Sequence, residues 1–280
     1  MQPTTADDAY SMATESIFTD LTKGKLYRFT YRVLNINGWS EFADTKYIRV
    51  AITPSKPAPP LLVEATDTTI QLKFYKPVDN GGSEIVSFEL YRNDGDAQTE
   101  PTIKVDSYNT NLLTHTLDTV TDSLTTGKIY KFVFRAINQV GESEDSNIVE
   151  YALCDVPVAP GAPTVMLSHT SESALSVEWP AVTSLASPGS DVTGYVLEMK
   201  DTRDMYGTYE IVFDGSELYP DIRNHLISDE RIVAGNNYIF RVKAKYQNGY
   251  SPYSSESLPV WACLPPRNLD PIELVSVDQT

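Results

Sequence analysis

The chain has 280 residues, a formal net charge of -16 and a pI near 4.5, and 41% of its residues are hydrophobic. This composition is typical of a globular protein rather than a disordered one, and the length indicates about two domains. The acidic balance argues against nucleic acid as a partner, because phosphate binding needs clustered Lys and Arg. The sequence contains no run of about 18 apolar residues, so we expect no membrane contact within this segment.

A strand pattern first appears in residues 1–54 and then recurs twice along the chain. Three segments read alike: GKLYRFTYRVLNINGWSEF from Gly24, GKIYKFVFRAINQVGESED from Gly127, and GNNYIFRVKAKYQNGYSPY from Gly235. Their tyrosines, Tyr27, Tyr130 and Tyr238, are 103 and 108 residues apart, and each follows an aliphatic residue by six positions: Leu21, Leu124 and Ile232. Apolar and polar residues alternate within each segment, which predicts a strand with one buried face. The chain therefore contains an internal repeat built from strands.

Upstream strands complete two of these repeats. Alternating residues end at Phe74 in one repeat and at Trp179 in the other, and each run is followed by a turn rich in Gly, Asn, Asp or Ser. A further alternating strand follows each turn and contains Phe88 or Tyr195. Short strands separated by turn signals, without a helical period, predict an all-β sandwich.

The repeats resemble fibronectin type III modules over almost the whole chain. The resemblance is carried by Trp179, the turn at 80–85, the tyrosine corner from Leu124 to Tyr130, and the segments 141–146 and 249–254 before the last strand. It implies tandem immunoglobulin-like β-sandwiches arranged as beads on a string. The expected core residues are Phe74, Trp179, Phe88, Tyr195, Leu21, Tyr27, Leu124, Tyr130, Ile232 and Tyr238. Phe74 departs from the pattern, since a tryptophan is usual at that position.

Proline-rich joints set the expected boundaries. Residues 1–54 supply the last three strands of one repeat, 55–155 and 156–264 are complete repeats, and 265–280 are the opening strand of another. Half a sandwich exposes its inner face to water, which is unfavourable. We therefore expect either an excerpt of a longer array or completion of the half-repeat by another chain.

Residues that carry chemistry are scarce. His115, His169 and His225 have no metal-ligand spacing, and the sequence has no nucleophile elbow and no glycine-rich phosphate loop. Cys154 and Cys263 lie 109 residues apart, in near-equivalent places of successive repeats, so we expect packed thiols at the joints rather than a disulfide within the chain. We expect no catalytic residues, no cofactor and no metal ligands. The acidic loops at 92–97 and 201–229 leave calcium binding open, although solvated turns explain them more simply.

Two aromatic residues are candidate partner contacts. Trp39 and Tyr250 occupy equivalent positions at the loop before the last strand, where the complete repeat between them has Glu142. Exposed Trp and Tyr are favoured residues in protein interfaces. Packing against a neighbouring domain would explain them equally well.

These features predict a non-enzymatic structural and protein-interaction array that spaces and presents binding surfaces. The expected partners are proteins and further repeats of the same polypeptide. Two alternatives stay open: the ectodomain of a cell-surface receptor or adhesion protein, and a spacer within a large secreted enzyme. The location is either extracellular or an intracellular ciliary or cytoskeletal scaffold. The absence of Asn-x-Ser/Thr acceptors favours the intracellular scaffold modestly.

Overall fold

The computed structural model describes residues 15–182, 188–204, 206–216, 219 and 221–264. Within these ranges every regular element is a β-strand except one 3-10 helix, η1 (Leu167–His169). No helix in the described part of the chain is long and apolar enough to cross a membrane. The predicted opening strand at 265–280 lies outside the described residues.

The first complete sandwich, called here the Phe74 sandwich, packs two antiparallel sheets. One sheet has the order β5-β6-β9, with β5 (Leu61–Ala65), β6 (Thr69–Lys73) and β9 (Thr114–Asp118). The other has the order β11-β10-β7-β8, with β7 (Ile85–Arg92), β8 (Ile103–Lys104), β10 (Ile129–Asn138) and β11 (Val149–Ala152). Their inner faces share one core of buried side chains. The fold class predicted from the repeat pattern is confirmed.

Three phenylalanines stack through the centre of the Phe74 sandwich. The ring of Phe134 lies 4.4 Å from that of Phe74 and 5.2 Å from that of Phe88, nearly parallel to both. Phe74 directly follows β6, and the register between β7 and β10 places Phe88 opposite Ala136. Alternation along the strands thus delivers aromatic rings from both sheets into one stack.

The second complete sandwich, the Trp179 sandwich, has the same architecture. One sheet has the order β12-β13-β16, with β12 (Thr164–Val165), β13 (Leu175–Glu178) and β16 (Asn224–Ile227). The other contains β14 (Gly194–Asp201), β15 (Glu210–Asp214), β17 (Asn237–Tyr246), β18 (Gly249–Tyr250) and β19 (Val260–Trp261). In the core, the Trp179 ring lies 6.1 Å from Tyr195 and 5.5 Å from Phe213.

The N-terminal unit consists of two strand pairs. β1 (Leu26–Phe29) pairs with β4 (Lys46–Arg49), and β2 (Leu34–Asn35) pairs with β3 (Gly38–Trp39). Leu21 and Tyr27 are only partly buried here, whereas the corresponding residues of the complete sandwiches are buried. The expectation of a core at these two positions therefore differs from the structure, because no second sheet faces β1 and β4 within the described residues. Tyr31 and Val33 are exposed, as expected for an open half-sandwich.

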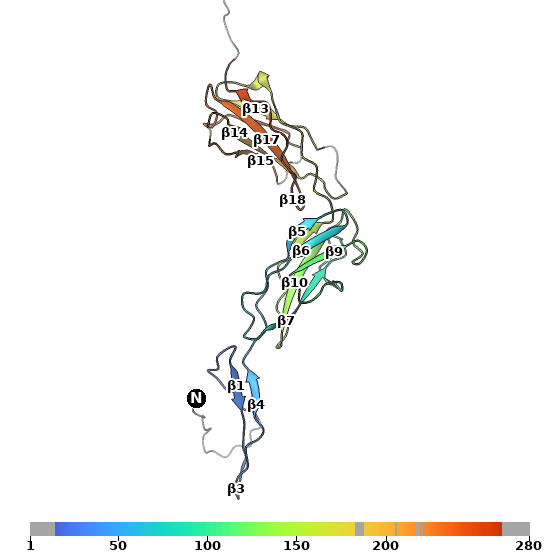
Figure 1. Ribbon diagram of the computed structural model, residues 1–280, viewed down its shortest axis with the longest axis vertical. Coiled ribbons are helices and arrows are strands. Elements are labelled where there is room, and N and C mark those ends of the chain that lie inside the picture. Colours follow the sequence, from blue (N-terminus) through green and yellow to red (C-terminus); the bar gives the residue numbers. More distant parts are fainter. Residues whose placement is uncertain (1–14, 183–187, 205, 217–218, 220, 265–280) are drawn as a thin grey trace, which may run out of the picture.

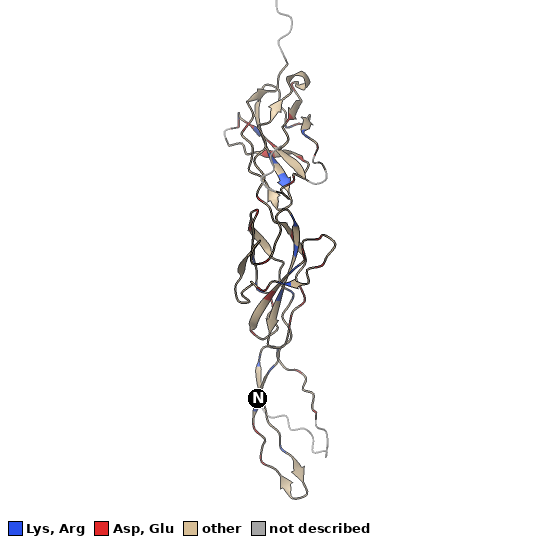
Figure 2. Cartoon of the chain, turned by 90° about the vertical axis from the view of Figure 1, so that its right-hand side faces the viewer, with Lys and Arg blue, Asp and Glu red and all other residues tan. Residues whose placement is uncertain are grey.

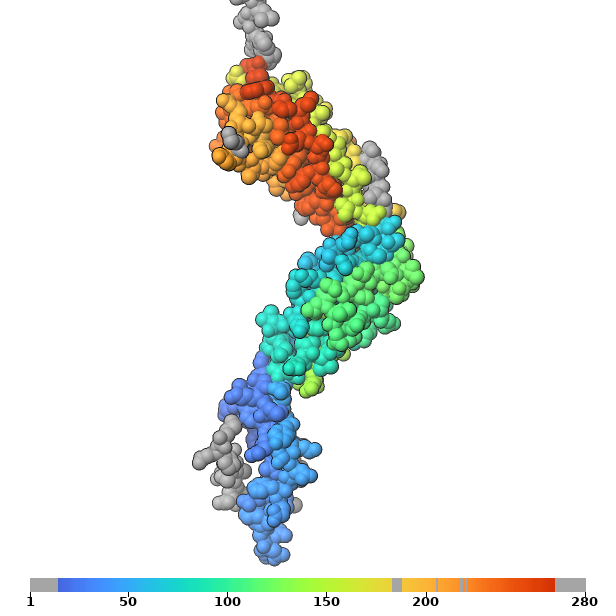
Figure 3. All heavy atoms as spheres, in the orientation of Figure 1, coloured from blue at the N-terminus to red at the C-terminus, as the bar shows by residue number. Residues whose placement is uncertain are grey.

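The units follow one another along the long axis of the molecule (Figures 1 and 3). β1 and β4 lie at one end, β7 and β10 run through the middle unit, and β14 and β17 belong to the last (Figure 1). In the space-filling view the chain narrows between units and changes direction there (Figure 3). The residues at these two narrow junctions therefore set the shape of the molecule.

Candidate functional site

Each repeat contains a tyrosine corner with the same hydrogen bond. The hydroxyls of Tyr27, Tyr130 and Tyr238 accept the backbone N–H of the residue five positions earlier, at 2.8, 2.8 and 2.7 Å. Tyr238 also donates to the backbone oxygen of Arg231 at 3.0 Å. In the half-exposed N-terminal unit, the backbone N–H of Thr22 holds the pKa of Tyr27 below its usual value. The corner fixes the turn that precedes each tyrosine, and this turn forms part of each junction.

Beside β10 and β17, serine hydroxyls accept backbone hydrogen bonds that a regular neighbouring strand would otherwise accept. Ser143 and Ser146 accept the N–H groups of Ala136 and Phe134, and Ser251, Ser254 and Ser257 do the same for Ala244, Val242 and Phe240. The backbone N–H of each serine also donates to the carbonyl of the same partner residue. The spacing of three residues matches the period of extended polyproline II chain. Serines therefore face the sheet, and the residues before them face outward.

These outward residues enclose a cation in all three repeats, and we call each arrangement a cation clamp. In the N-terminal unit the Arg32 guanidinium lies 4.2 Å from the Trp39 ring centre and 5.1 Å from that of Phe42. In the Trp179 sandwich the Lys243 ammonium lies 4.5 Å from Tyr250 and 4.8 Å from Tyr253. A cation over a ring face is attracted by the ring quadrupole. Both predicted partner contacts, Trp39 and Tyr250, thus belong to clamps.

The Phe74 sandwich builds the same clamp from carboxylates. Arg135 holds the position of Arg32 and Lys243, and its guanidinium pairs with Glu142 and, at 2.8 Å, with Asp145. Hydrogen bonding to Asp145 raises the pKa of Arg135 further above its usual range. The clamp position is therefore retained while its chemistry changes from aromatic to ionic.

A second layer extends the clamp of the Trp179 sandwich. The Arg241 guanidinium lies between the rings of Tyr209 and Tyr253, at 3.7 and 3.8 Å, and donates two hydrogen bonds to Glu198. Glu198 is 6% exposed, and its other oxygen accepts the Tyr253 hydroxyl at 2.6 Å. Burial raises the pKa of Glu198, but the hydrogen bonds from Tyr253 and Arg241 together outweigh it and leave the pKa below its usual value. Figure 2 marks the Lys and Arg positions along the backbone in blue.

The clamp aromatics keep part of their surface in solvent. Trp39 is 53% exposed and Tyr250 is 42% exposed. Within the described residues the Trp39 ring contacts the Arg32 cation, and the Tyr250 ring contacts the Lys243 and Lys245 cations. The structure therefore places both residues at surfaces, on a rigid support of strand and cation.

Glycine turns meet at both junctions between units. A Cβ on Gly82 would lie 2.7 Å from the backbone nitrogen of Gly24, and a Cβ on Gly189 would lie 2.8 Å from the Cα of Gly127. All four glycines have φ between +83 and +86°. Only glycine combines this backbone conformation with so close an approach. The turns after Leu21 and Leu124 therefore each dock on the turn between the second and third strands of the next unit.

An asparagine side chain joins the units at each junction. At the first, Asn138 donates to the backbone oxygens of Ile52 and Asn80, at 2.7 and 2.9 Å. At the second, Asn248 accepts the Ala152 N–H at 2.7 Å and donates to the Ala152 oxygen at 2.8 Å. Tyr246 packs there in a small buried cluster with Ala152 and Cys154. The two asparagines come from positions two residues apart in the repeat, so the junctions share a layout but differ in detail.

The linker prolines are part of the packed structure. Six of them are buried and recur every three residues: Pro54, Pro57 and Pro60 in one linker, and Pro157, Pro160 and Pro163 in the other. Proline restricts the backbone to extended conformations, which stiffens a short linker. The linkers therefore limit rotation between neighbouring sandwiches.

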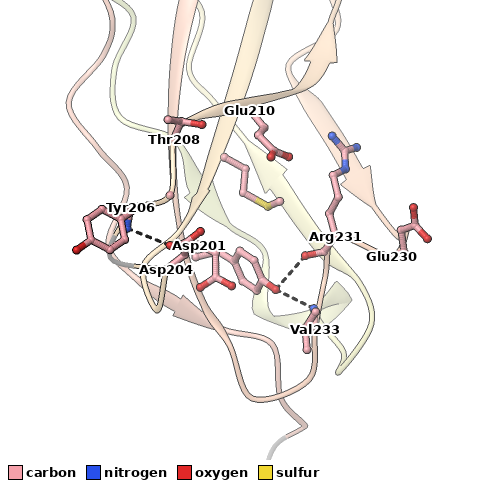
Figure 4. Close-up of a pocket in the computed structure, with 11 residues that line it drawn as sticks. Asp201, Asp204, Tyr206, Thr208, Glu210, Glu230, Arg231 and Val233 are labelled. Carbon is pink, nitrogen blue, oxygen red and sulfur yellow. Dashed lines mark hydrogen bonds between the residues drawn. The ribbon is translucent and has the colours of Figure 1, made fainter.

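Four acidic residues, Asp201, Asp204, Glu210 and Glu230, line a depression in the Trp179 sandwich (Figure 4), and Tyr238 also lines it. Backbone and side-chain donors already bind Asp201 and Asp204. In the described ranges no three acidic, His or Cys side chains are grouped to hold a metal ion. Burial lowers the pKa of His115 and His225, which lie in different sandwiches.

The two cysteines are both free, and they differ in exposure. Cys154 is buried at the second junction, whereas Cys263 is exposed. Burial raises the pKa of the Cys154 thiol to about 11, with smaller contributions from Asp155 and Asp191. Cys154 is the packed thiol that the sequence predicts, whereas Cys263 is not packed against the residues that the structure describes.

Comparison with known proteins finds relatives that match most of the chain, although no family model matches it. The chain is 24% identical to a titin homolog of Caenorhabditis elegans and 26% identical to human myomesin-2, over 88% and 86% of its length. It is 28% identical over 89% of its length to human fibronectin type-III domain-containing protein 3A. The crystal structure of chicken CNTN1 FN1-FN3 domains matches 88% of this chain and 77% of that one, with 18% identity and a TM-score of 0.45. These relatives support the prediction of an array of fibronectin type III repeats.

The chain spans 1%, 16% and 20% of the lengths of these three relatives. Sequence reasoning about the array identified one residue of each aromatic clamp, Trp39 and Tyr250, but missed the other ring, the cations and the junction asparagines. Arg32, Arg135 and Lys243 each lie seven residues before the clamp position, so the repeat alignment contained a signal for them. Asn138 and Asn248 gave no such signal, because they are not equivalent positions in the repeat.

Proposed function

We propose that this chain is a non-enzymatic structural and protein-interaction array, which spaces and presents binding surfaces within a larger protein or assembly. The repeats are bounded as the prolines suggest: part of a repeat at 1–54, complete repeats at 55–155 and 156–264, and the opening of another at 265–280. The observation that carries the proposal is the recurrence of the same glycine-to-glycine contact at both junctions. A free linker between independent domains would have no need for it.

The junctions support the spacing role by physical argument. At each of them a glycine contact, an asparagine hydrogen bond and three buried prolines act together. An ion pair between Lys23 and Asp79 and a 2.9 Å bond from the Ile52 N–H to the Gly81 oxygen strengthen the first. Several small contacts that share one geometry favour a narrow range of angles between neighbours, as in other linear repeat proteins.

The clamp faces support the presenting role. Trp39 and Tyr250 are amphipathic, partly exposed and held by cations, so little side-chain entropy is lost when a partner covers them. We propose them as contact residues for protein partners. Their similarity in position means that a partner recognising one clamp meets a related surface two repeats away.

Small-angle X-ray scattering of the whole chain tests the spacing role. We expect one extended conformation to reproduce the profile, at both low and high salt. A profile that requires a mixture of freely rotating sandwiches would refute a spacing function. Scattering from a Gly127→Val variant provides the comparison, because a side chain there collides with Pro188 across the second junction.

A further inference from the structure

The Asn248 side chain closes the second junction through a pair of hydrogen bonds to one residue. Its Oδ1 accepts from the Ala152 N–H and its Nδ2 donates to the Ala152 oxygen, at 2.7 and 2.8 Å. Ala152 is the last residue of β11, so the amide takes the place of a neighbouring strand. Only a side-chain amide offers a donor and an acceptor side by side in this way. The junction therefore depends on the amide chemistry of one residue.

The residue that follows is Gly249, in the hairpin between β17 and β18. A Cβ at Gly249 would have nothing within 4 Å, so neither the glycine nor its surroundings shield the backbone from the Asn248 side chain. An Asn-Gly pair in a turn is the arrangement in which the next backbone nitrogen most easily reaches the side-chain carbonyl carbon. We propose that Asn248 is a site of spontaneous deamidation, which converts the closed second junction irreversibly into an open one.

The reaction needs only water. The backbone nitrogen of Gly249 loses its proton to solvent and attacks Cγ of Asn248, the Cγ–Nδ2 bond breaks, and the amide nitrogen leaves as ammonia. The resulting five-membered succinimide adds one water molecule at either carbonyl and opens to aspartate or isoaspartate. The net change is the hydrolysis of an amide to a carboxylic acid and ammonia, with no oxidation. Asn248 must leave Ala152 before its Cγ can turn toward Gly249, so the reaction proceeds from the open junction.

The product does not fit the site that the amide occupied. A carboxylate has acceptors only, so it faces the Ala152 oxygen without a proton to share. The site is also acidic already: the Asn248 amide nitrogen lies 3.9 Å from the Cys154 sulfur, and the charges of Asp155 and Asp191 act on this thiol. A new negative charge there is repelled by its neighbours. The junction that opens to allow the reaction is therefore prevented from closing in the same form.

The chain contains its own matched control. Asn37 and Gly38 form the same dipeptide in the equivalent hairpin of the N-terminal unit, between β2 and β3. Asn37 is exposed, and in the described part of the chain its side-chain amide makes no hydrogen bond to another residue. The two sites thus differ chiefly in the contact with Ala152. The ratio of their deamidation rates measures how strongly the junction holds Asn248.

Peptide mapping by mass spectrometry of the whole chain, aged at 37 °C and mildly alkaline pH, tests the proposal. We expect aspartate and isoaspartate at both sites, with Asn248 reacting at least about tenfold more slowly than Asn37, which corresponds to about 1.4 kcal/mol of junction opening. In denaturant the two rates should converge. Equal deamidation rates at the two sites in the folded chain would show that the contact with Ala152 does not protect Asn248. If Asn248 gave no product after all Asn37 had reacted, Asn248 would not be a deamidation site. Either result overturns the proposal.

A second measurement tests whether deamidation of Asn248 opens the second junction. Spin labels at Lys73→Cys in β6 and Ile211→Cys in β15, with Cys263→Ser, report the distance between the two sandwiches. We expect Asn248→Asp to broaden this distance distribution, and Asn37→Asp to leave it unchanged. If Asn248→Asp prevents folding of the Trp179 sandwich, the aged Asn37→Asp chain provides the same comparison, once the fraction that peptide mapping shows to be modified at Asn248 has been separated by charge. An unchanged distance distribution in both the Asn248→Asp variant and the aged chain would contradict the opening of the junction.

Discussion

The Phe74 and Trp179 sandwiches place different chemistry on one framework. At the clamp, Arg135 pairs with carboxylates in the first, and Lys243 lies over tyrosines in the second. In the core, a stack of phenylalanines in the first corresponds to a tryptophan with tilted aromatic neighbours in the second. Strand register and the serine contacts determine the positions of the side chains, whereas the residue types at these positions differ between the two sandwiches. The two sandwiches should therefore respond differently to the same perturbation.

Truncation of the central aromatic residue should give the largest effect. Trp179→Ala and Phe74→Ala each remove a buried ring, which typically costs about 3–5 kcal/mol. That is a large part of the roughly 5–15 kcal/mol that stabilises one domain. Differential scanning calorimetry of the chain should show each variant shifting the transition of its own sandwich. If either variant left both transitions in place, the assignment of its core would fail.

The loss of stability on replacing each corner tyrosine with phenylalanine should increase with the burial of the tyrosine and with the number of its hydrogen bonds. Tyr238→Phe loses an accepted and a donated bond, Tyr130→Phe loses one part-buried accepted bond, and Tyr27→Phe loses the same bond in an exposed site. A buried N–H left without a partner costs about 1–3 kcal/mol. Denaturant titration should order the losses as Tyr238, Tyr130, Tyr27. An inverted order would mean that the corner is not supported by its core.

Acid should destabilise the Trp179 sandwich through Glu198. The folded pKa of this carboxyl lies below its usual value of 4.5, so its contribution is complete above that value and is lost as the pH falls through the folded pKa. Glu198→Gln should flatten the fall in thermal midpoint between about pH 6 and about pH 3. Glu89→Gln is the matched variant of the Phe74 sandwich, since hydrogen bonding to Lys104 lowers the pKa of Glu89. A profile unchanged by Glu198→Gln would contradict the network.

Substitution of the clamp cations should give the smallest loss of stability, and the loss should depend on salt in one clamp and not in the other. Exposed ion pairs contribute about 0–1 kcal/mol and are screened by salt, so the loss from Arg135→Gln should shrink between about 0.1 and about 1 M salt. The loss from Lys243→Gln should persist, because the Lys243 clamp consists of ring faces and of the nearly buried Glu198 at 3.8 Å. The stability of both variants at two salt concentrations decides this. Equal salt dependence would erase the distinction between ionic and aromatic clamps.

The fold could be predicted from the sequence because its signals are local and repeated. Alternation around Tyr130 and Tyr238, together with the turn residues, specifies strands and their faces. The junctions could not be predicted, because they join residues far apart in the chain, such as Asn248 with Ala152. The clamps could be predicted in part. Trp39 and Tyr250 could be named from the repeat alignment. Their stacking on cations could not, because it depends on how the segment that follows lies beside its neighbouring strand.

The N-terminal unit shows the limit of pattern reasoning most clearly. Leu21 and Tyr27 match the spacing of the complete repeats, and the tyrosine corner forms. Burial depends on a second sheet, however, which spacing within one strand does not supply. The same sequence pattern thus gives a buried core in two repeats and a partly exposed face in the third.

The central claim is that built junctions hold successive sandwiches in a fixed relation. The distance between spin labels at positions 73 and 211 tests it most directly, in the otherwise unmodified chain and in Gly127→Ala and Gly235→Ala variants. Both glycines have positive φ, but only a Cβ at Gly127 meets the next unit, at 2.8 Å from Pro188. We predict one narrow distance distribution that changes with Gly127→Ala and not with Gly235→Ala. A broad distribution in the unmodified chain, or equal effects of the two substitutions, would contradict the claim.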